Sequence, residues 1–290
     1  MKKYLLLSFV SVFLLLGLFF YLNASLKDGR LHLIVCDVRQ GDGILIRTPN
    51  GSDILVDGGP DASILNCLSK HLPFWDRTIE LIIVTHSDAD HSAGIINVLQ
   101  SYNLISFATQ STYRKTEVYS RLLKLLASKK TEVRYLSKGD KLSLTDGTTF
   151  NIFSPNSKTV HALDKTDSSF KNFPVNDFAV VSRLNYGNFS AFLTADAGAN
   201  VEDEIALDIG KIDVLKIPHP GSKTGMSDYF LSNINPSLAI ISVGKHNSYG
   251  HPTKIALDLL KKYNIKFLRT DLNGEVEIIT DGKTYSVVSN

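Results

Sequence analysis

Four side chains of the kind that bind metal ions lie within six consecutive residues of this 290-residue chain. Two are imidazoles and two are carboxylates: His86, Asp88, Asp90 and His91. Imidazole nitrogen and carboxylate oxygen are ligands that suit zinc and manganese alike. Because side chains alternate along an extended segment, the first three would point to the same side, and His91 would turn back from the next element. The spacing predicts a metal-binding loop.

The loop follows an apolar run, and further candidate ligands follow other apolar runs. Residues 79–84 predict a buried strand before the loop, and residues 91–102 predict a helix after it. Asp196, His219 and His251 each come where a later strand is predicted to end. Four clustered ligands suggest two ions roughly 3.5–4 Å apart, and such a pair needs a bridging carboxylate and ligands from elsewhere. We expect these three residues to supply them.

Taken singly, the candidates have ordinary explanations. A lone His-x-Asp is compatible with a surface loop, Asp196 could cap a helix that begins near Asn200, and a lone His219 or His251 could be a surface histidine. Asp57 is equally compatible with a turn residue that supports the metal loop and with a ligand. Three polar residues near the first predicted strand could likewise be ordinary turn formers: Asp37, Gln40 and Asp42. Only the complete set, with a strand before the loop and a helix after it, favours metal chemistry.

The rest of the chain alternates short strands with helices, which indicates an α/β domain. Strands are predicted at residues 31–38, 44–46, 54–56, 133–136, within 141–155, and at 178–184, 189–193, 214–217, 237–243, 266–269, 276–279 and 285–288. Helices are predicted at residues 61–71, 117–128, 201–207 and 253–263 and near Tyr229. Residues 156–176 are polar and have no period. A loop of that length in a compact domain is mobile or functional, so we expect it to border the site.

Composition is that of a globular protein. With 43% hydrophobic and 21% charged residues, the chain can form one large domain or two small ones. The formal net charge of +2 lacks the electrostatic signature of a dedicated nucleic-acid binder. Two cysteines are too few for a disulfide framework or a thiolate zinc site. Because Cys36 and Cys67 both lie in apolar surroundings, we interpret them as buried small hydrophobic residues and not as a disulfide.

The N-terminus differs in composition from everything after it. Lys2 and Lys3 precede residues 4–25, which carry no charge and are rich in Leu, Phe and Val. This run is close to the roughly 20 residues that span a bilayer and exceeds a typical signal-peptide core of roughly 7–15 residues. We predict an uncleaved anchor at residues 1–25, spanning the membrane through residues 4–22, then a linker at 26–30 and one extracellular domain at 31–290. A cleaved signal with secretion, or a buried core helix, are the alternatives.

Several short segments resemble one family in the same order. Residues 86–94, His-Ser-Asp-Ala-Asp-His-Ser-Ala-Gly, resemble the His-x-Asp-x-Asp-His-x-Gly-Gly signature of the metallo-β-lactamase superfamily, in the variant found in the extracellular nuclease-like domain of the competence protein ComEC. Six further motifs of that branch have similar counterparts at residues 36–43, 55–59, 176–181, 193–196, 214–219 and 242–252. The resemblance covers about residues 31–282.

The resemblance implies a four-layer αββα sandwich with two divalent ions, Zn or Mn, at one edge. His86 and Asp88 would hold one ion, Asp90 and His91 the other, and Asp196 would bridge them. His219 would complete a ligand shell, and His251 would lie at the mouth as a ligand or as a hydrogen-bond donor to the developing negative charge. The third histidine usual at the first ion has no clear match here. His161 in the polar loop is a candidate for it, and Asn176 would line the pocket instead.

The function that follows is an exported metal-dependent hydrolase that uses a bridging hydroxide on a phosphodiester, either a small substrate or a polymer such as nucleic acid or a surface phospho-polymer. Asp90 or Asp196 would accept the nucleophile's proton, and His251 or Lys216 would stabilise the leaving oxygen. Whether Ser222 touches substrate, and which proteins are partners, the sequence leaves open. Alternatives are a metal-stabilised binding module without turnover, and an acyl, thioester or β-lactam hydrolase, against which the aspartate at position 88 argues.

Four positions depart from the family pattern. Arg39, Ala93 and Ala195 stand where glycine is usual, and Pro220 stands where a second histidine is usual. Only Pro220 removes a possible ligand or proton donor, and it is the sole sequence support for the binding module. No segment after residue 25 is apolar for long enough to form part of a membrane channel.

Overall fold

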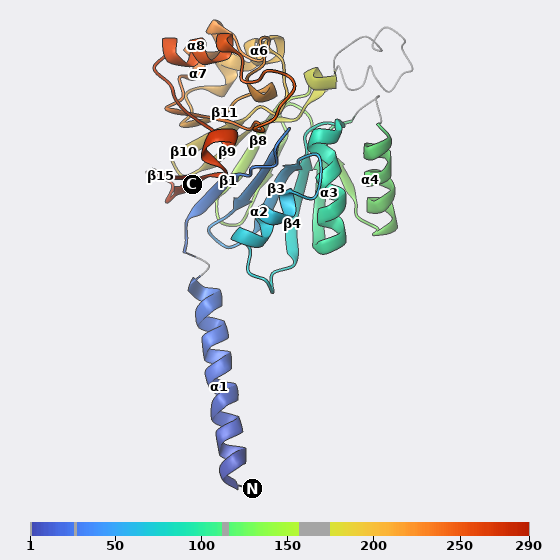
Figure 1. Ribbon diagram of the computed structural model, residues 1–290, viewed down its shortest axis with the longest axis vertical. Helices are drawn as coiled ribbons and strands as arrows, with labels where there is room; N and C mark the ends of the chain where they lie inside the picture. The colour runs from blue at the N-terminus through green and yellow to red at the C-terminus, as the bar shows by residue number, and fades with distance from the viewer. Residues whose placement is uncertain (1, 26–27, 112–115, 157–174, 290) are drawn as a thin grey trace.

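Two mixed β-sheets form the centre of the domain, and helices cover their outer faces (Figure 1). The computed structural model describes residues 2–25, 28–111, 116–156 and 175–289. Within these ranges the α/β architecture with two sheets is as predicted from the sequence. The loop expected to border the site falls largely at residues 157–174, and His161 with it, so both lie outside the described residues.

The first sheet has eight strands in the order β15-β14-β1-β2-β3-β4-β5-β6. The strands from β3 to β6 are parallel, whereas β14, β1, β2 and β3 are paired antiparallel. Their bounds are β1 Leu31–Val35, β2 Gly43–Arg47, β3 Asp53–Gly58, β4 Thr78–Val84, β5 Asn103–Thr109, β6 Val133–Tyr135, β14 Val276–Thr280 and β15 Tyr285–Ser289. The helices of its outer layer are α2 Ile64–His71, α3 Ala89–Ser101 and α4 Glu117–Ser128.

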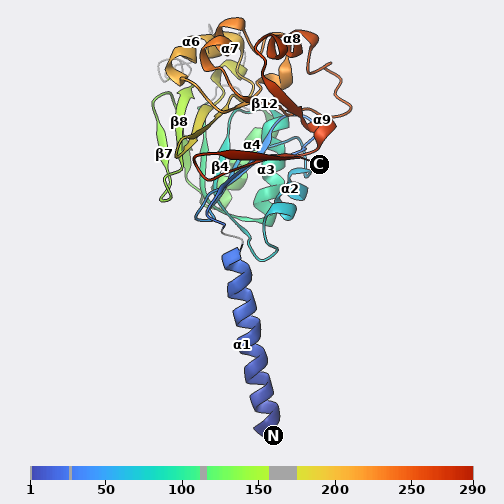
Figure 2. The ribbon, with the colours of Figure 1, turned by 90° about the vertical axis from the view of Figure 1, so that its left-hand side faces the viewer.

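The second sheet has seven strands in the order β13-β12-β11-β10-β9-β8-β7. Their bounds are β7 Lys141–Ser143, β8 Thr149–Ser154, β9 Val181–Tyr186, β10 Phe189–Leu193, β11 Val214–Lys216, β12 Leu238–Ile241 and β13 Lys266–Arg269. Its outer helices are α6 Ala199–Ile209, α7 Asp228–Ile234 and α8 Lys254–Lys262, which lie above the sheet in Figure 2. Short helical segments are also present among the described residues: η2 Val175–Phe178, η3 His219–Gly221 and α9 Thr270–Asn273.

Burial on both faces explains why the strands appear in the sequence as continuous apolar runs. Along β1, Leu33 and Val35 belong to the core between the sheets, while Ile34 belongs to the layer under the helices. Leu45 on β2 and Leu55 on β3 likewise face the helices, while their neighbours face the other sheet. Because successive side chains alternate between two buried faces, each strand is apolar throughout.

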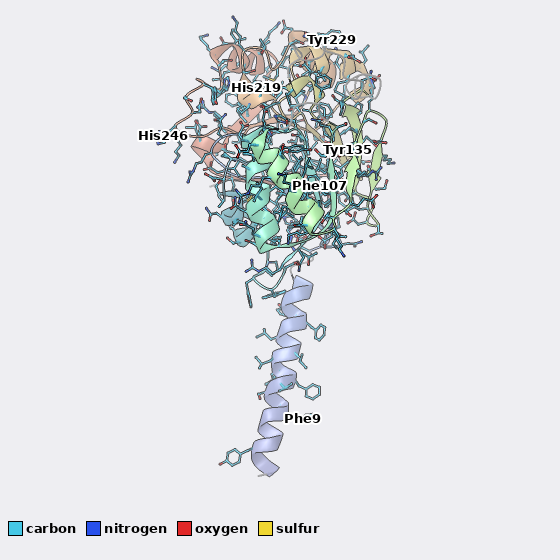
Figure 3. All side chains as sticks on the ribbon, turned by 90° about the vertical axis from the view of Figure 1, so that its right-hand side faces the viewer. Phe9, Phe107, Tyr135, His219, Tyr229 and His246 are labelled. Carbon is cyan, nitrogen blue, oxygen red and sulfur yellow. A yellow bond between two sulfur atoms is a disulfide. The ribbon has the colours of Figure 1, made fainter. Side chains whose placement is uncertain are left out.

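Helix α1, Lys2–Ser25, stands apart from the domain and its described side chains are exposed (Figures 1 and 3). Many of them are large and apolar, and Phe9, labelled in Figure 3, projects from the helix. Within the described ranges, none of the helices has both the length and the sustained apolarity needed to cross a bilayer. The anchor expected at residues 4–22 stays a prediction.

The interpretation of the two cysteines as unpaired was wrong, because Cys36 and Cys67 form a disulfide. Cys36 follows β1 and Cys67 lies on α2, and both belong to the layer between the first sheet and its helices. Their Cα atoms are 5.9 Å apart, a separation that a disulfide spans. The sequence shows only that each cysteine is surrounded by apolar residues. The packing of α2 on the sheet is what makes them neighbours.

Replacing both cysteines, Cys36→Ala with Cys67→Ala, should lower the free energy of unfolding by about 3 kcal/mol. The bond closes a loop across a sequence separation of 31 residues, and cross-links of this kind mainly restrict the unfolded chain. Urea unfolding of the non-reduced proteins measures the difference. A thiol reductant should shift the wild type towards the variant and leave the variant unchanged, and identical midpoints without reductant would contradict the expectation.

Candidate metal centre

Two buried histidines form the middle of the site. His86 follows the end of β4, and His91 lies in the first turn of α3, so the short loop between strand and helix brings their ring centroids to 4.1 Å. Both side chains are fully buried. The loop therefore places two imidazoles side by side, as the spacing of the sequence predicted for a metal loop.

The carboxylate of Asp57 fixes the orientation of both rings. It accepts hydrogen bonds from the Thr85 amide at 2.8 Å, from the Thr85 hydroxyl at 2.6 Å and from His91 Nδ1 at 2.8 Å. Since the Thr85 hydroxyl hydrogen goes to Asp57, its oxygen is left to accept from His86 Nδ1, which is 3.0 Å away. His86 therefore carries its proton on Nδ1 and presents the lone pair of Nε2, the arrangement of a metal-ligating histidine, and His91 would present the same atom once a cation displaces the proton there.

Three atoms of the site are buried without a hydrogen-bond partner, and His91 lies next to both of the other residues: His86 Nε2, His91 Nε2 and Asp196 Oδ1. Asp196 follows β10 of the second sheet, and its Oδ1 lies 3.4 Å from His91 Nε2. Buried polar atoms in proteins nearly always have a partner. Two imidazole nitrogens and a carboxylate oxygen are ligands that a divalent cation accepts, so the residues fit a metal ion.

The electrostatics of the three groups are those of ligands. Burial, with the neighbouring His91, lowers the pKa of His86 to about 4, so this imidazole is neutral at pH 7. Burial disfavours the charged form of His91, but the carboxylates of Asp196 and Asp57 raise its pKa well above the usual value. Burial would raise the pKa of Asp196, yet His91 outweighs it and the pKa is lowered. A cation at His91 would therefore displace a proton, as metals commonly do.

Asp196 does not cap a helix, which was the ordinary explanation for this residue. Helix α6 begins at Ala199, and Gly198 occupies the capping position. Asp196 instead lies in the turn after β10, in which Ala195 has a left-handed backbone with φ of +51°. Glycine adopts this conformation without strain, which agrees with the glycine expected there from the family pattern. Of the other two positions where the pattern has glycine, Arg39 also has a positive φ, of +72°.

His219 and His251 lie next to each other at the outer side of the site. Their ring centroids are 5.8 Å apart, and both side chains are half-buried. His219 comes from η3, in the C-terminal half of the domain, where Figure 3 labels it. The Asn247 side chain donates to the His251 carbonyl and accepts from the His251 amide, each at 2.8 Å. This pair of bonds fixes the backbone at the mouth.

The other predicted site residues make fewer close contacts with the buried histidines. Asp88 Oδ2 lies 3.9 Å from His86 Nε2. Asp90 is half-buried in the first turn of α3, and no contact of its carboxylate with another predicted ligand is described. Asn176 lies on η2, and two residues after that helix the Val180 amide donates to the Thr85 carbonyl at 2.9 Å. The Ser222 hydroxyl is buried without a hydrogen-bond partner.

Two predictions about supporting residues need correction. Lys216 was expected to meet a leaving oxygen, but its ammonium is buried and donates to Asp42 Oδ2 at 2.6 Å and to the Ile217 carbonyl at 2.9 Å. The turn-former explanation of Asp42 does not describe its side chain, which is only 1% exposed. Asp57, which could have been either a ligand or a support, has both oxygens occupied by hydrogen bonds and supports the loop.

Glycines explain how closely the segments of the site approach one another. A Cβ atom on Gly94 would lie 1.9 Å from the carbonyl oxygen of Gly58, where α3 crosses the end of β3. The preceding Ala93 lies in the regular helix, so of the two glycines in the family signature only the second is required here. Gly41 is equally confined, since a Cβ there would lie 1.9 Å from the Asp90 carbonyl oxygen.

Sequence reasoning missed two contributors to the site, Thr85 and Asp42. Thr85 precedes the first ligand directly, and a hydroxyl at that place is a signal only when the carboxylate of Asp57 is known to lie beside it. Asp42 lies between two glycines after a predicted strand, a pattern that is common in turns. Neither pattern distinguishes a buried polar partner from a surface residue.

The sequence is similar to that of known proteins over most of its length. Residues 36–138 match the metallo-beta-lactamase superfamily. The chain is 30% identical to Recombination protein 2 of Haemophilus influenzae over 251 residues, which is 83% of this chain and 28% of that protein. It is 27% identical to ComE operon protein 3 of Bacillus subtilis over 270 residues, 87% of this chain and 33% of that protein. The chain thus spans about a third of these relatives' length.

The fold itself recurs in solved structures. The metallo-beta-lactamase fold protein YhfI from Bacillus subtilis superposes with a TM-score of 0.56 at 13% identity, over 83% of this chain and 96% of that one. An identity this low shows a shared fold and leaves the chemistry to the residues of this chain.

Thr85→Val should weaken metal binding about tenfold with little change in fold. The substitution keeps the shape of the side chain but leaves His86 Nδ1 without a hydrogen-bond acceptor, and loss of such a supporting bond typically costs 10–100-fold in affinity. Titration of the demetallated protein with Mn²⁺ or Zn²⁺ against a chelating dye measures the change. The matched control is Thr116→Val. It removes another hydroxyl hydrogen bond to the same loop, the one that Thr116 donates to the Ser87 carbonyl. Equal affinity of wild type and Thr85→Val would contradict this account of the ring orientations.

Proposed function

The chain belongs to the metallo-β-lactamase superfamily, and on that premise we propose that it is a metal-dependent phosphodiesterase that acts outside the cytoplasm. The observation that carries the proposal is that His91 lies beside both His86 and Asp196, and that His86 Nε2, His91 Nε2 and Asp196 Oδ1 are all buried without hydrogen-bond partners. The superfamily contains metal-dependent hydrolases, and these atoms are where a hydrolytic metal would be held.

When bound, divalent ions lower the pKa of water towards neutrality and polarise the bond under attack. The chain's own residues prepare for that chemistry in distinct ways. Asp57 and Thr85 hold the two imidazoles in one tautomer, so the lone pairs point outward without reorganisation. In this proposal Asp196, buried beside them, would accept a proton from the nucleophile. His251, which is half-buried next to His219, would stabilise the leaving group.

The names of the relatives support a nucleic-acid substrate as a proposal. One is named Recombination protein 2, and another, from Neisseria gonorrhoeae, is named Competence protein ComA. Since this chain spans only about a third of such proteins, the transfer to it is a proposal. We propose nucleic acid as the first substrate to test, with a surface phospho-polymer or a small phosphodiester as the other members of the same class.

The proposed location is the outer face of a membrane. The disulfide between Cys36 and Cys67 is typical of proteins that mature in an oxidising compartment. Helix α1 displays large apolar side chains that the domain does not cover. A chain anchored through residues 4–22 would combine both features, and a secreted chain would account for the first.

A binding module without turnover is the second candidate, and one observation favours it. Pro220 is buried where the family pattern has a second histidine, so the chain lacks one imidazole that could carry a proton or hold a metal. Retention of metal without hydrolysis of any phosphodiester, ester or β-lactam would establish this alternative.

Asp196→Asn should reduce hydrolysis of bis-p-nitrophenyl phosphate by more than about 100-fold while the fold persists. The amide keeps the shape of the carboxylate but removes the charge that faces His91. Turnover with added Mn²⁺ or Zn²⁺ and unfolding by circular dichroism are measured together.

Asp208→Asn is the matched control, since this aspartate is exposed on α6 and pairs only with Lys138 at 2.9 Å among the described contacts. It should keep full activity. A wild-type rate in Asp196→Asn would refute the proposed role, and activity on β-lactams or thioesters alone would refute the substrate class.

A further inference from the structure

A buried acidic side chain outside the predicted ligand set faces the site. Asp42 lies in the loop between β1 and β2, and its Oδ2 is bonded to the Lys216 ammonium at 2.6 Å. Its other oxygen, Oδ1, is buried and has no hydrogen-bond partner. Lys216, itself 1% exposed, is therefore paired with only half of this carboxylate.

An unpartnered oxygen on a buried carboxylate is costly, and the ion pair does not remove that cost. Burying an ionised carboxylate is tolerated when its lone pairs are satisfied by hydrogen bonds, a counter-charge or a metal. Here Oδ2 has the Lys216 ammonium as counter-charge, and Oδ1 has no hydrogen-bond partner. The position of Asp42 therefore indicates a second cationic partner for its carboxylate.

That partner has a place to bind. Asp42, His91 and Asp196 each offer a ligand atom, and these atoms lie within 4.8 Å of one another. His91 Nε2 and Asp196 Oδ1 are themselves buried and without hydrogen-bond partners. Ligand groups from three separate segments, the β1–β2 loop, α3 and the turn after β10, thus lie within reach of one cation.

The loop that carries Asp42 is held by contacts on both sides. Gly59 donates its amide to the Asp42 carbonyl at 2.7 Å, and the Ser242 hydroxyl donates to the Gly41 carbonyl at 2.7 Å. Gly41 has φ of +75° and packs against the Asp90 backbone too closely for any side chain. Backbone bonds of this kind fix a ligand's position before the metal arrives.

We propose that Asp42 is a protein ligand of the metal held by His91 and Asp196, and that Lys216 keeps its carboxylate in place. The inference rests on the metal centre of the proposed function but not on its reaction. Because two carboxylates and one imidazole form this site, it should suit divalent ions that prefer oxygen ligands, such as Mn²⁺, better than a site rich in nitrogen or sulfur would. The basic side chain also offsets the charge of an otherwise doubly acidic pocket.

The test is metal content of the full chain, with no substrate involved. Wild type and Asp42→Asn are loaded with Mn²⁺, dialysed and analysed by inductively coupled plasma mass spectrometry, and affinities follow from titration against a chelating dye. We expect Asp42→Asn to lose about one equivalent of metal per chain or to bind the weaker equivalent at least tenfold less tightly. Failure of the proposed reaction would leave this readout unaffected, so the two can fail separately.

Asp37→Asn is the matched control. Asp37 lies five residues earlier in the same loop, is exposed, and accepts only from the Arg39 amide at 3.2 Å among the described contacts. This variant should bind metal as the wild type does. Metal stoichiometry and affinity in Asp42→Asn equal to those of the wild type would overturn the proposal.

Loss of folding is separated from loss of a ligand by a second variant. Asp42→Asn leaves the Lys216 ammonium buried without its partner, which alone can be strongly destabilising. The double variant Asp42→Asn with Lys216→Met removes both charges and should fold, as judged by its unfolding transition in the presence of chelator. A folded double variant with full metal content would show that the pair is purely structural and would overturn the proposal.

Discussion

The carboxylate of Asp57 is the group on which the metal centre depends. Through three hydrogen bonds it joins the end of β3 to the end of β4 and to the start of α3, and through Thr85 it reaches His86 as well. Because these hydrogen bonds are short and buried, the Asp57 side chain restricts the orientation of the two imidazole rings more than the backbone alone would. The two imidazoles are therefore prepared for a cation before one binds, which reduces the reorganisation that binding requires.

Much of the fold could be predicted because apolar runs on doubly buried strands are easy to recognise. Residues 79–84, 189–193 and 266–269 were expected as strands and lie in β4, β10 and β13. Short segments that depend on tertiary contacts were not foreseen, such as α9 at Thr270–Asn273, whose Thr270 hydroxyl accepts from the Val243 amide. Likewise the disulfide depends on how α2 packs, which no local pattern of residues specifies.

The residues of the candidate site also differ in whether local sequence or tertiary contacts reveal their roles. His86, His91 and Asp196 were recognisable because metal chemistry restricts both residue type and position after a strand. Asp42 and Thr85 were not, since their roles arise from partners 174 and 28 residues away in the chain, Lys216 and Asp57. Lys216 was misjudged for a related reason: its charge suggested a role towards substrate, while its burial places it inside the protein with Asp42 as counter-ion.

The contact between His91 and Asp196 also has a meaning for the assembly of the domain. The two residues come from opposite layers of the fold: His91 lies on α3, which covers the first sheet, and Asp196 lies in the turn after β10 of the second sheet. A cation bound by both residues would cross-link the two halves of the domain. Its binding free energy would add to the stability of the folded state. Supply of metal in the compartment where the domain folds would then govern how much of it survives there, independently of whether substrate is present.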